Sequence, residues 1–396
     1  MKLQLTKTKT IEINFPGGHS STGPRGLSDV TGVVLNSGDV RGCPAVRLTR
    51  NKKGAWAIAA AGFVPPPEGD LPASWEEMNH QPSWSLPPEF QAPHAALSVL
   101  SPDMFIRQTS PDALSAGLGD SENEPMSPAL GKKKLGIRRE TASTASSAGS
   151  KSDIVLGQPV SASGTRYVAQ PLAEEPFVVQ TGLPEFQVLW LSRLLPEGKR
   201  PTAYSVQTLP SSLLAALSEQ PQFVEAGGTA FAIYVLREAI YLAGYRDGQL
   251  LLFRQCPGVT GWEMMREGVK LRLGLDDDMV DSILDDAIVD PRSAMEPFVR
   301  PVLQQLEISL DYLSSRHGLT VEKVFLMGLP SGARYWSQMA EEALHLPLIA
   351  PSVFDGIQLP AKNAALLELT ASQSQVFLPA FGAARAAMEG TMEVRT

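Results

Sequence analysis

Two parts of the chain, about half a chain apart, follow the same pattern of short predicted strands. In 223–254, β-branched and aromatic residues predict a strand, a loop at Gly227 and Gly228, and two further antiparallel strands. Near the start, strands are predicted at 32–35, 40–49 and 56–64, with a polar loop after the first. Because internal duplication constrains a fold more firmly than local propensity, the pattern predicts two similar domains.

Two glycine loops are candidate ligand sites. A glycine pair such as Gly227-Gly228 lets a ligand approach exposed main-chain N–H groups, although an ordinary bulge or turn explains it equally simply. The sequence Gly-Leu-Pro-Ser-Gly at 328–332 lies between an apolar strand and a predicted helix, which is typical of an α/β crossover. The loop then faces the N-terminus of that helix, where phosphates bind, unless Ser331 only caps the helix.

Helical periodicity is confined to the second half, and prolines interrupt the first. Apolar residues recur at helical spacing after Thr260, after Met279 and along 294–317, where Gly318 is the predicted stop. Prolines every few residues in 65–93 exclude a continuous helix or a central strand there. The tryptophans of this segment are expected to hold it against a surface; the alternative is a proline-rich ligand for another domain.

These patterns divide the chain into five parts. They are an N-terminal extension (1–30), a first domain (31–109) that contains the 65–93 segment, an insertion (110–164), the remainder of the first domain (165–220), and a second domain (221–390) that ends in a helix. The insertion has no aromatic residue and carries five positive charges between Lys132 and Arg139. It is predicted to be a mobile linker or a reduced small subdomain, and limited proteolysis should cut first near those charges.

Composition excludes several classes of protein. The chain has 396 residues, 43% of them hydrophobic, and a formal net charge of -8, which gives no basic field for nucleic acid. No run reaches the ~18 apolar residues of a spanning helix, and the N-terminus lacks a signal region, so a cytoplasmic location is expected. Cys43 and Cys256 stand far apart, each before a proline, and are expected to be packing residues rather than a disulfide or metal ligands.

The order of elements resembles the actin-like ATPase superfold and, more narrowly, the PilM-like type IV pilus assembly proteins, which are related to the cell-division protein FtsA. The resemblance lies in two glycine-loop hairpins, a long helix, a strand followed by GLPSG and a helix, and a final helix of small residues at 381–386. The sequence DGQLLLFRQCPG is similar to a strand of that family which ends in an arginine before a glycine. The resemblance implies an α/β fold of duplicated actin-like (ribonuclease H-like) domains flanking a nucleotide cleft.

The resemblance also implies a nucleotide site, with ATP and Mg²⁺ as the cofactor. Its residues would be Asn36, Ser37 and Gly38 in a first phosphate loop, Gly227, Gly228 and Thr229 in a second, Gly328, Ser331 and Gly332 beside the adenosine, and Glu307 near the ribose or base. Asn36 stands where the family usually has an aspartate that handles the metal, and Glu225-Ala226-Gly227 replaces an expected Asp-x-Gly. A neutral amide interacts more weakly with hydrated Mg²⁺ than a carboxylate does, so hydrolysis is expected to be weak or absent.

The implied function is a cytoplasmic scaffold at the inner face of the inner membrane, in a type IV pilus or a related type II secretion assembly. It would hold the cytoplasmic tail of a PilN-like bitopic membrane partner and contact other pilus assembly components. The alternatives are an FtsA-like cell-division protein and a small-molecule kinase of the same superfold, for which Glu225 is the one carboxylate near a glycine loop. Serine hydrolysis is excluded because GLPSG is not a G-x-S-x-G elbow.

Overall fold

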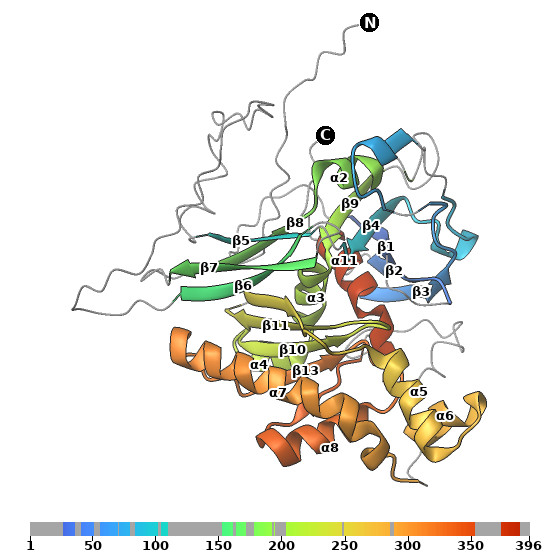
Figure 1. Ribbon diagram of the computed structural model, residues 1–396. Coiled ribbons are helices and arrows are strands. Elements are labelled where there is room, and N and C mark those ends of the chain that lie inside the picture. The colour runs from blue at the N-terminus through green and yellow to red at the C-terminus, as the bar shows by residue number, and fades with distance from the viewer. Residues whose placement is uncertain are drawn as a thin grey trace, which may run out of the picture.

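The computed structural model consists of two lobes, each built on a five-stranded sheet (Figure 1). The structure describes residues 27–35, 41–50, 56–69, 71–79, 84–101, 104–109, 153–160, 164–171, 178–191, 194, 203–247, 249–285, 289–352 and 374–388. None of the helices in these ranges is both long and apolar enough to cross a lipid bilayer.

The two sheets have the same strand order and the same strand directions. The first has the order β3 (Trp56–Val64), β2 (Cys43–Arg50), β1 (Asp29–Leu35), β4 (His94–Val99) and β9 (Ala203–Thr208). The second has the order β12 (Gln249–Gln255), β11 (Ile240–Arg246), β10 (Ala230–Val235), β13 (Val324–Met327) and β14 (Leu348–Ile349). In each, the first three strands are antiparallel and the last three are parallel. The predicted duplication is therefore confirmed.

Two helices, α3 (Leu209–Leu217) and α11 (Leu378–Met388), lie between the sheets and share one core with both (Figure 1). Small residues on α11 let its backbone lie very close to that of α3, since a Cβ added at Gly382 would lie 1.8 Å from the carbonyl oxygen of Ser212. The 3₁₀ turn η3 (Gln375–Phe377) leads into α11. The C-terminal helix, expected within the second domain, thus packs directly on β1 and α3 of the first lobe.

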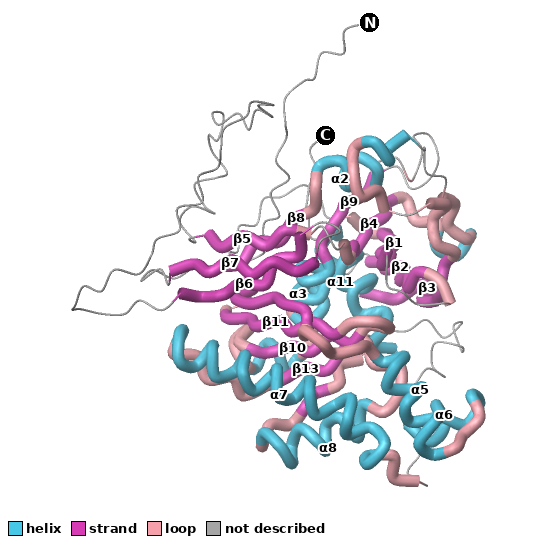
Figure 2. Tube along the Cα trace, viewed as in Figure 1, coloured by secondary structure: helices cyan, strands magenta, loops and turns pink. Residues whose placement is uncertain are grey.

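Helices cover the outer face of the second sheet. They are α5 (Trp262–Leu273), α6 (Asp277–Asp285), α7 (Arg292–His317) and α8 (Ala333–Leu344) (Figure 2). Their apolar sides form a second core around Phe231, Val302 and Trp336. As predicted, α7 ends at Gly318, which has the left-handed conformation typical of a helix C-terminus.

The outer face of the first sheet is covered by the proline-rich segment and by α2 (Glu185–Leu191). The segment contains only the 3₁₀ turns η1 (Glu76–Asn79) and η2 (Pro88–Phe90), so the predicted lack of a continuous helix is confirmed for its described part. Trp84 is buried and its indole N–H donates to the carbonyl oxygen of Pro65 at 2.8 Å, as expected for an anchoring residue. Trp75 differs, because 55% of it is exposed.

A set of short strands lies beside β12 and projects from the first lobe (Figures 1 and 2). β5 (Phe105–Thr109) pairs with β8 (Val178–Gly182), and β6 (Asp153–Val160) pairs with β7 (Gly164–Pro171), both antiparallel. Residues 153–160 of the predicted insertion are therefore strand, which favours the small-subdomain alternative there. Residues 110–152, with their positive charges, lie outside the described residues.

Candidate functional site

The carboxyl ends of β10 and β13 bring two loops together in the second lobe. The strands are parallel, with Phe231 opposite Val324 and Tyr234 opposite Met327, so both end at the same edge. Residues 236–239, which connect β10 to β11, and residues 328–332 follow at that edge. The two loops begin very close together, because a Cβ added at Gly328 would lie only 2.4 Å from the carbonyl oxygen of Val235. In α/β sheets, this is the edge at which ligands usually bind.

The connection at 236–239 is bonded to the protein itself. The N–H of Leu236 donates to the carbonyl oxygen of Ala239 at 2.8 Å, which closes the turn. The carbonyl oxygens of Leu236 and Arg237 accept the N–H groups of Trp262 and Glu263, at 3.0 and 3.2 Å. These are the first residues of α5, so the orphan N–H groups of that helix terminus are used by the loop. We call these contacts the α5 clasp.

An ion pair strengthens the α5 clasp. The Arg237 guanidinium pairs with the Glu263 carboxylate, and both side chains are partly exposed. The hydrogen bond from Arg237 lowers the pKa of Glu263 below its ordinary value, so the carboxylate is ionised at neutral pH. The Arg237 guanidinium, which could otherwise meet a phosphate at this loop, already pairs with the Glu263 carboxylate of α5.

A side chain from α6 contacts the loop at 328–332. Gly332, and not Ser331, is the N-cap residue of α8, and its N–H donates to Oδ1 of Asp285 with a nitrogen-to-oxygen distance of 3.4 Å. One N–H at the start of α8 is therefore directed at a carboxylate, which disfavours an added anion there. Ser331 is buried, with 4% exposed.

Gly227, Gly228 and Thr229 have a different role from the one predicted. The strand expected at 223–225 is wrong, because Pro221–Glu225 forms helix α4. The N–H groups of the three residues donate to the carbonyl oxygens of Val224, Phe223 and Ala226 at 2.9, 3.0 and 3.0 Å. Both glycines have positive φ, at 62° and 75°. This is a helix C-cap of the Schellman kind, in which the N–H groups are already used.

The glycine pair and the 328–332 loop also lie at opposite edges of the sheet. Gly227 and Gly228 precede β10, whereas residues 236–239 and 328–332 follow β10 and β13. The six residues of β10 separate the two edges by about 20 Å, at ~3.3 Å per residue. The structure therefore does not bring the predicted second phosphate loop together with the predicted adenosine loop.

The other predicted site residues are distributed as follows. Met295 of α7 packs near Gly332, and Glu307 lies twelve residues further along the same helix, about 18 Å away at 1.5 Å per residue. Glu307 is exposed to solvent and does not join the 328–332 loop. Asn36, Ser37 and Gly38 lie outside the described residues, in the connection between β1 and β2 that corresponds to 236–239.

Metal and thiol chemistry find no support in the described part of the chain. No group of three or more His, Cys, Asp or Glu side chains there could hold a metal ion. Cys43 and Cys256 are buried free thiols, as expected for packing residues, and burial raises their pKa to about 11 and about 12.

Sequence reasoning missed residues 236–239 as the true counterpart of the first loop. The connection has no glycine, and so it gives no local signal of a ligand loop; its residues are Leu236, Arg237, Glu238 and Ala239. The available signal was positional, since the loop follows the first strand of the second half just as 36–42 follows the first strand of the chain.

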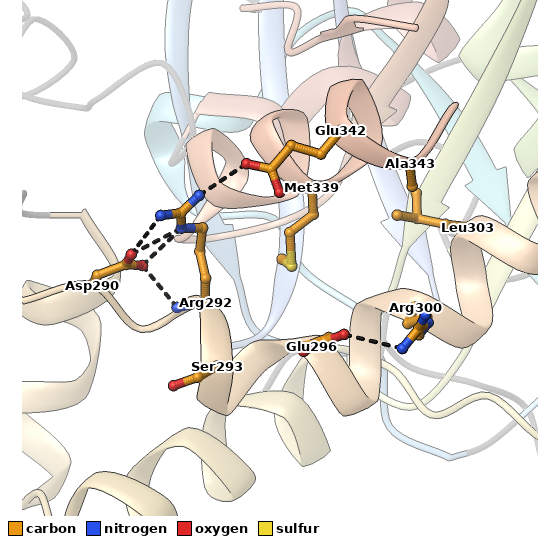
Figure 3. Close-up of a pocket in the computed structure, with 9 residues that line it drawn as sticks. All are labelled: Asp290, Arg292, Ser293, Glu296, Arg300, Leu303, Met339, Glu342 and Ala343. Carbon is orange, nitrogen blue, oxygen red and sulfur yellow. Dashed lines mark hydrogen bonds and ion pairs between the residues drawn. The ribbon is translucent and has the colours of Figure 1, made fainter. Parts of the chain in front are cut away.

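A separate groove of about 470 Å³ lies on the outer surface between α7 and α8 (Figure 3). Arg292 bridges Asp290 at 2.7 Å and Glu342 at 3.0 Å, and Arg300 pairs with Glu296 at 3.2 Å. Both guanidinium groups that line the groove are thus engaged by carboxylates, so it offers no ready site for an anion.

Two like sheets with paired helices between them define the actin-like ATPase fold. The solved structure of a PilM–PilN type IV pilus biogenesis complex is similar to this chain, at 15% identity over 92% of this chain and 99% of that chain, with a TM-score of 0.53. A Bacteroides thetaiotaomicron protein with an actin-like ATPase fold is 10% identical over 81% of this chain and 90% of its own, with a TM-score of 0.34. No protein-family model and no curated protein matches the sequence.

Proposed function

We propose that this chain is a cytoplasmic scaffold of a type IV pilus or related type II secretion assembly, and that it binds the cytoplasmic tail of a PilN-like membrane partner. The observation that carries the proposal is the extent of the structural match. It covers 92% of this chain and 99% of a chain from a PilM–PilN complex. A scaffold of this kind works from the inner face of the inner membrane, through its partner and other assembly components.

We expect nucleotide hydrolysis to be weak or absent. In the second lobe, the α5 clasp engages the carbonyl oxygens of Leu236 and Arg237 and pairs the Arg237 guanidinium with Glu263. The N–H of Gly332 faces Asp285. These residues do not fit a triphosphate with Mg²⁺, because an added anion would have to displace carboxylates already in place. A nucleotide at this edge would depend on the first loop, at Asn36, Ser37 and Gly38, and on the main chain of Gly328, Ser331 and Gly332.

A small-molecule kinase of the same superfold is not favoured. The one carboxylate that sequence reasoning offered as its base, Glu225, lies before the glycine pair at the opposite edge of the second sheet. It pairs with Lys323 at 3.0 Å. A general base must reach the substrate hydroxyl beside the transferred phosphate, which this position does not allow.

Membrane recruitment tests the proposal. The chain is expressed with the PilN-like protein of the same genome, either complete or lacking its cytoplasmic residues, and membranes are separated by flotation. We expect the chain to float with membranes only when the complete partner is present. A chain that remains unbound with both forms of the partner would contradict the proposed function.

A further inference from the structure

One tryptophan stands apart from the other five of the chain. All six are described, and Trp84, Trp190 and Trp336 are buried, while Trp56 and Trp262 are partly buried. Trp75 is 55% exposed. An exposed tryptophan leaves a large apolar surface in water, and tryptophan is the residue type most enriched at the energetic centres of protein interfaces.

Trp75 is held firmly although it is exposed. The side chain of Gln187 on α2, itself buried, donates to the carbonyl oxygen of Pro72 at 3.1 Å. The N–H of Ala73 donates to the carboxylate of Glu77 at 2.7 Å. The rings of Trp75 and Phe186 contact each other, with centroids 5.9 Å apart. A turn held by such bonds presents its side chains to a partner without a large further loss of backbone entropy. We call Trp75, Phe186 and the turn 72–77 the Trp75 platform.

The segment that carries Trp75 is acidic. The segment 65–93 contains five acidic residues, Glu68, Asp70, Glu76, Glu77 and Glu89, and no lysine or arginine. Glu76 and Glu77, next to Trp75, are exposed. Such a surface repels anionic lipid headgroups and nucleic acid, and it attracts segments rich in lysine and arginine.

We propose that the Trp75 platform binds a basic, partly apolar segment of a protein partner, and that this segment is the cytoplasmic end of a bitopic membrane protein. Cytoplasmic flanks of membrane helices carry an excess of lysine and arginine, which complements the acidic segment. A lysine or arginine side chain also packs favourably over an indole ring, and the apolar side chains of the segment cover Trp75 and Phe186. This assignment of the binding surface rests on the proposed function.

Peptide titration tests the surface. The probes are a labelled peptide in which leucine alternates with lysine and its counterpart with glutamate in place of lysine, each titrated into the full chain. We expect the lysine peptide to bind the wild type, to bind more weakly in high salt, and to bind Trp75→Ala at least about tenfold more weakly, since tryptophans at the centre of an interface carry much of its affinity. The glutamate peptide should not bind.

The control is Leu271→Ala, which removes another exposed apolar side chain, 79% exposed on α5 in the second lobe. It should bind the lysine peptide as the wild type does, and Trp75→Phe should retain most of the affinity because it keeps an aromatic ring. Unfolding curves should be the same for Trp75→Ala and wild type, since the side chain is exposed. Equal binding by Trp75→Ala and Leu271→Ala, or by the two peptides, would overturn the proposal.

Titration with the cytoplasmic peptide of the PilN-like protein separates this proposal from the proposed function. If that peptide binds wild type and Trp75→Ala equally, the platform is not its site, while the scaffold function stands. If it does not bind the wild type but the lysine peptide binds through Trp75, the scaffold function fails together with the assignment of the membrane partner, and the platform remains a binding surface for basic segments.

Discussion

The two lobes contain the same sheet but differ in the connection that follows the first strand of each. In the first lobe, the seven residues 36–42 join β1 to β2 and include Ser37 and Gly38. In the second lobe, four residues without glycine join β10 to β11 and are bonded into the α5 clasp. Both sheets pack on α3 and α11 in one core. Among the described residues, the connections after β1 and β10 contribute little to that core. The loop that follows the first strand can therefore differ between the lobes while the sheets stay alike.

The lobes differ again between their third and fourth strands. In the first lobe this connection is the proline-rich segment, which presents Trp75. In the second lobe it consists of α5, α6 and α7, which are packed against the sheet. The first lobe thus offers an irregular surface with an aromatic residue available to a partner, and the second provides a compact support.

The largest effect is expected where the lobes share a core. In Gly382→Val, the new side chain would meet the carbonyl oxygen of Ser212 and force α11 away from α3, which should cost about 3 kcal/mol or more of unfolding free energy. Urea unfolding followed in both lobes, for example by hydrogen exchange of β1 and β10, should show them weakened together.

The matched control is Gly258→Ala. Gly258 has positive φ, unlike the helical Gly382, and no atom lies within 4 Å of an added Cβ, so only backbone strain of ~1 kcal/mol is expected. A Gly382→Val protein as stable as Gly258→Ala would show that α11 is not closely packed against α3.

An intermediate effect on the unfolding free energy is expected at the glycine pair. It distinguishes a helix cap from a phosphate loop as the role of these residues. Gly228→Ala should lower the unfolding free energy by ~1 kcal/mol because of its positive φ, and Gly228→Asn should lower it less, since asparagine tolerates this conformation. Neither variant should alter any response to nucleotide. Loss of nucleotide binding at unchanged stability would restore the phosphate-loop interpretation.

The smallest effect concerns the charges that hold α5 and α6 together in the second lobe. Lys270, and then Arg266, lower the pKa of Asp277. The folded state therefore favours the ionised carboxylate, so this contribution is present above the ordinary pKa of ~4 and is lost as the pH falls through the lowered value.

The urea midpoints of wild type and Asp277→Asn should therefore differ slightly at pH 6, and the difference should shrink as the pH falls below the ordinary pKa of ~4. Asp311→Asn, on the exposed side of α7, is the control and should change the midpoint less at pH 6. A difference between wild type and Asp277→Asn that grows on acidification would contradict the assignment.

The sequence predicted those parts of the fold that depend on local patterns. An apolar run after a turn predicted a strand at 56–64, where β3 lies, and helical spacing with Gly318 predicted the end of α7. The strand expected at 223–225 failed because Phe223 and Val224 favour strands, while Pro221 and the glycine pair fix a short helix at its two ends.

The site was less predictable, because it depends on contacts between distant residues. Nothing near Arg237 in the sequence indicates that its loop is bonded to the start of α5, and nothing near Phe381 indicates that the last helix returns to the first lobe. Both depend on how complete helices and sheets pack together, which a local pattern does not encode.

The central claim, that the second lobe no longer supports a phosphate site, is tested most directly by calorimetric titration of the full chain with Mg·ATP. The account predicts a Kd no tighter than about 1 mM, which is about -4 kcal/mol, and no measurable hydrolysis. Micromolar binding that Gly328→Val removes and Gly228→Asn leaves intact would contradict it, because a nucleotide would then be held at the very edge that the α5 clasp and Asp285 are proposed to close.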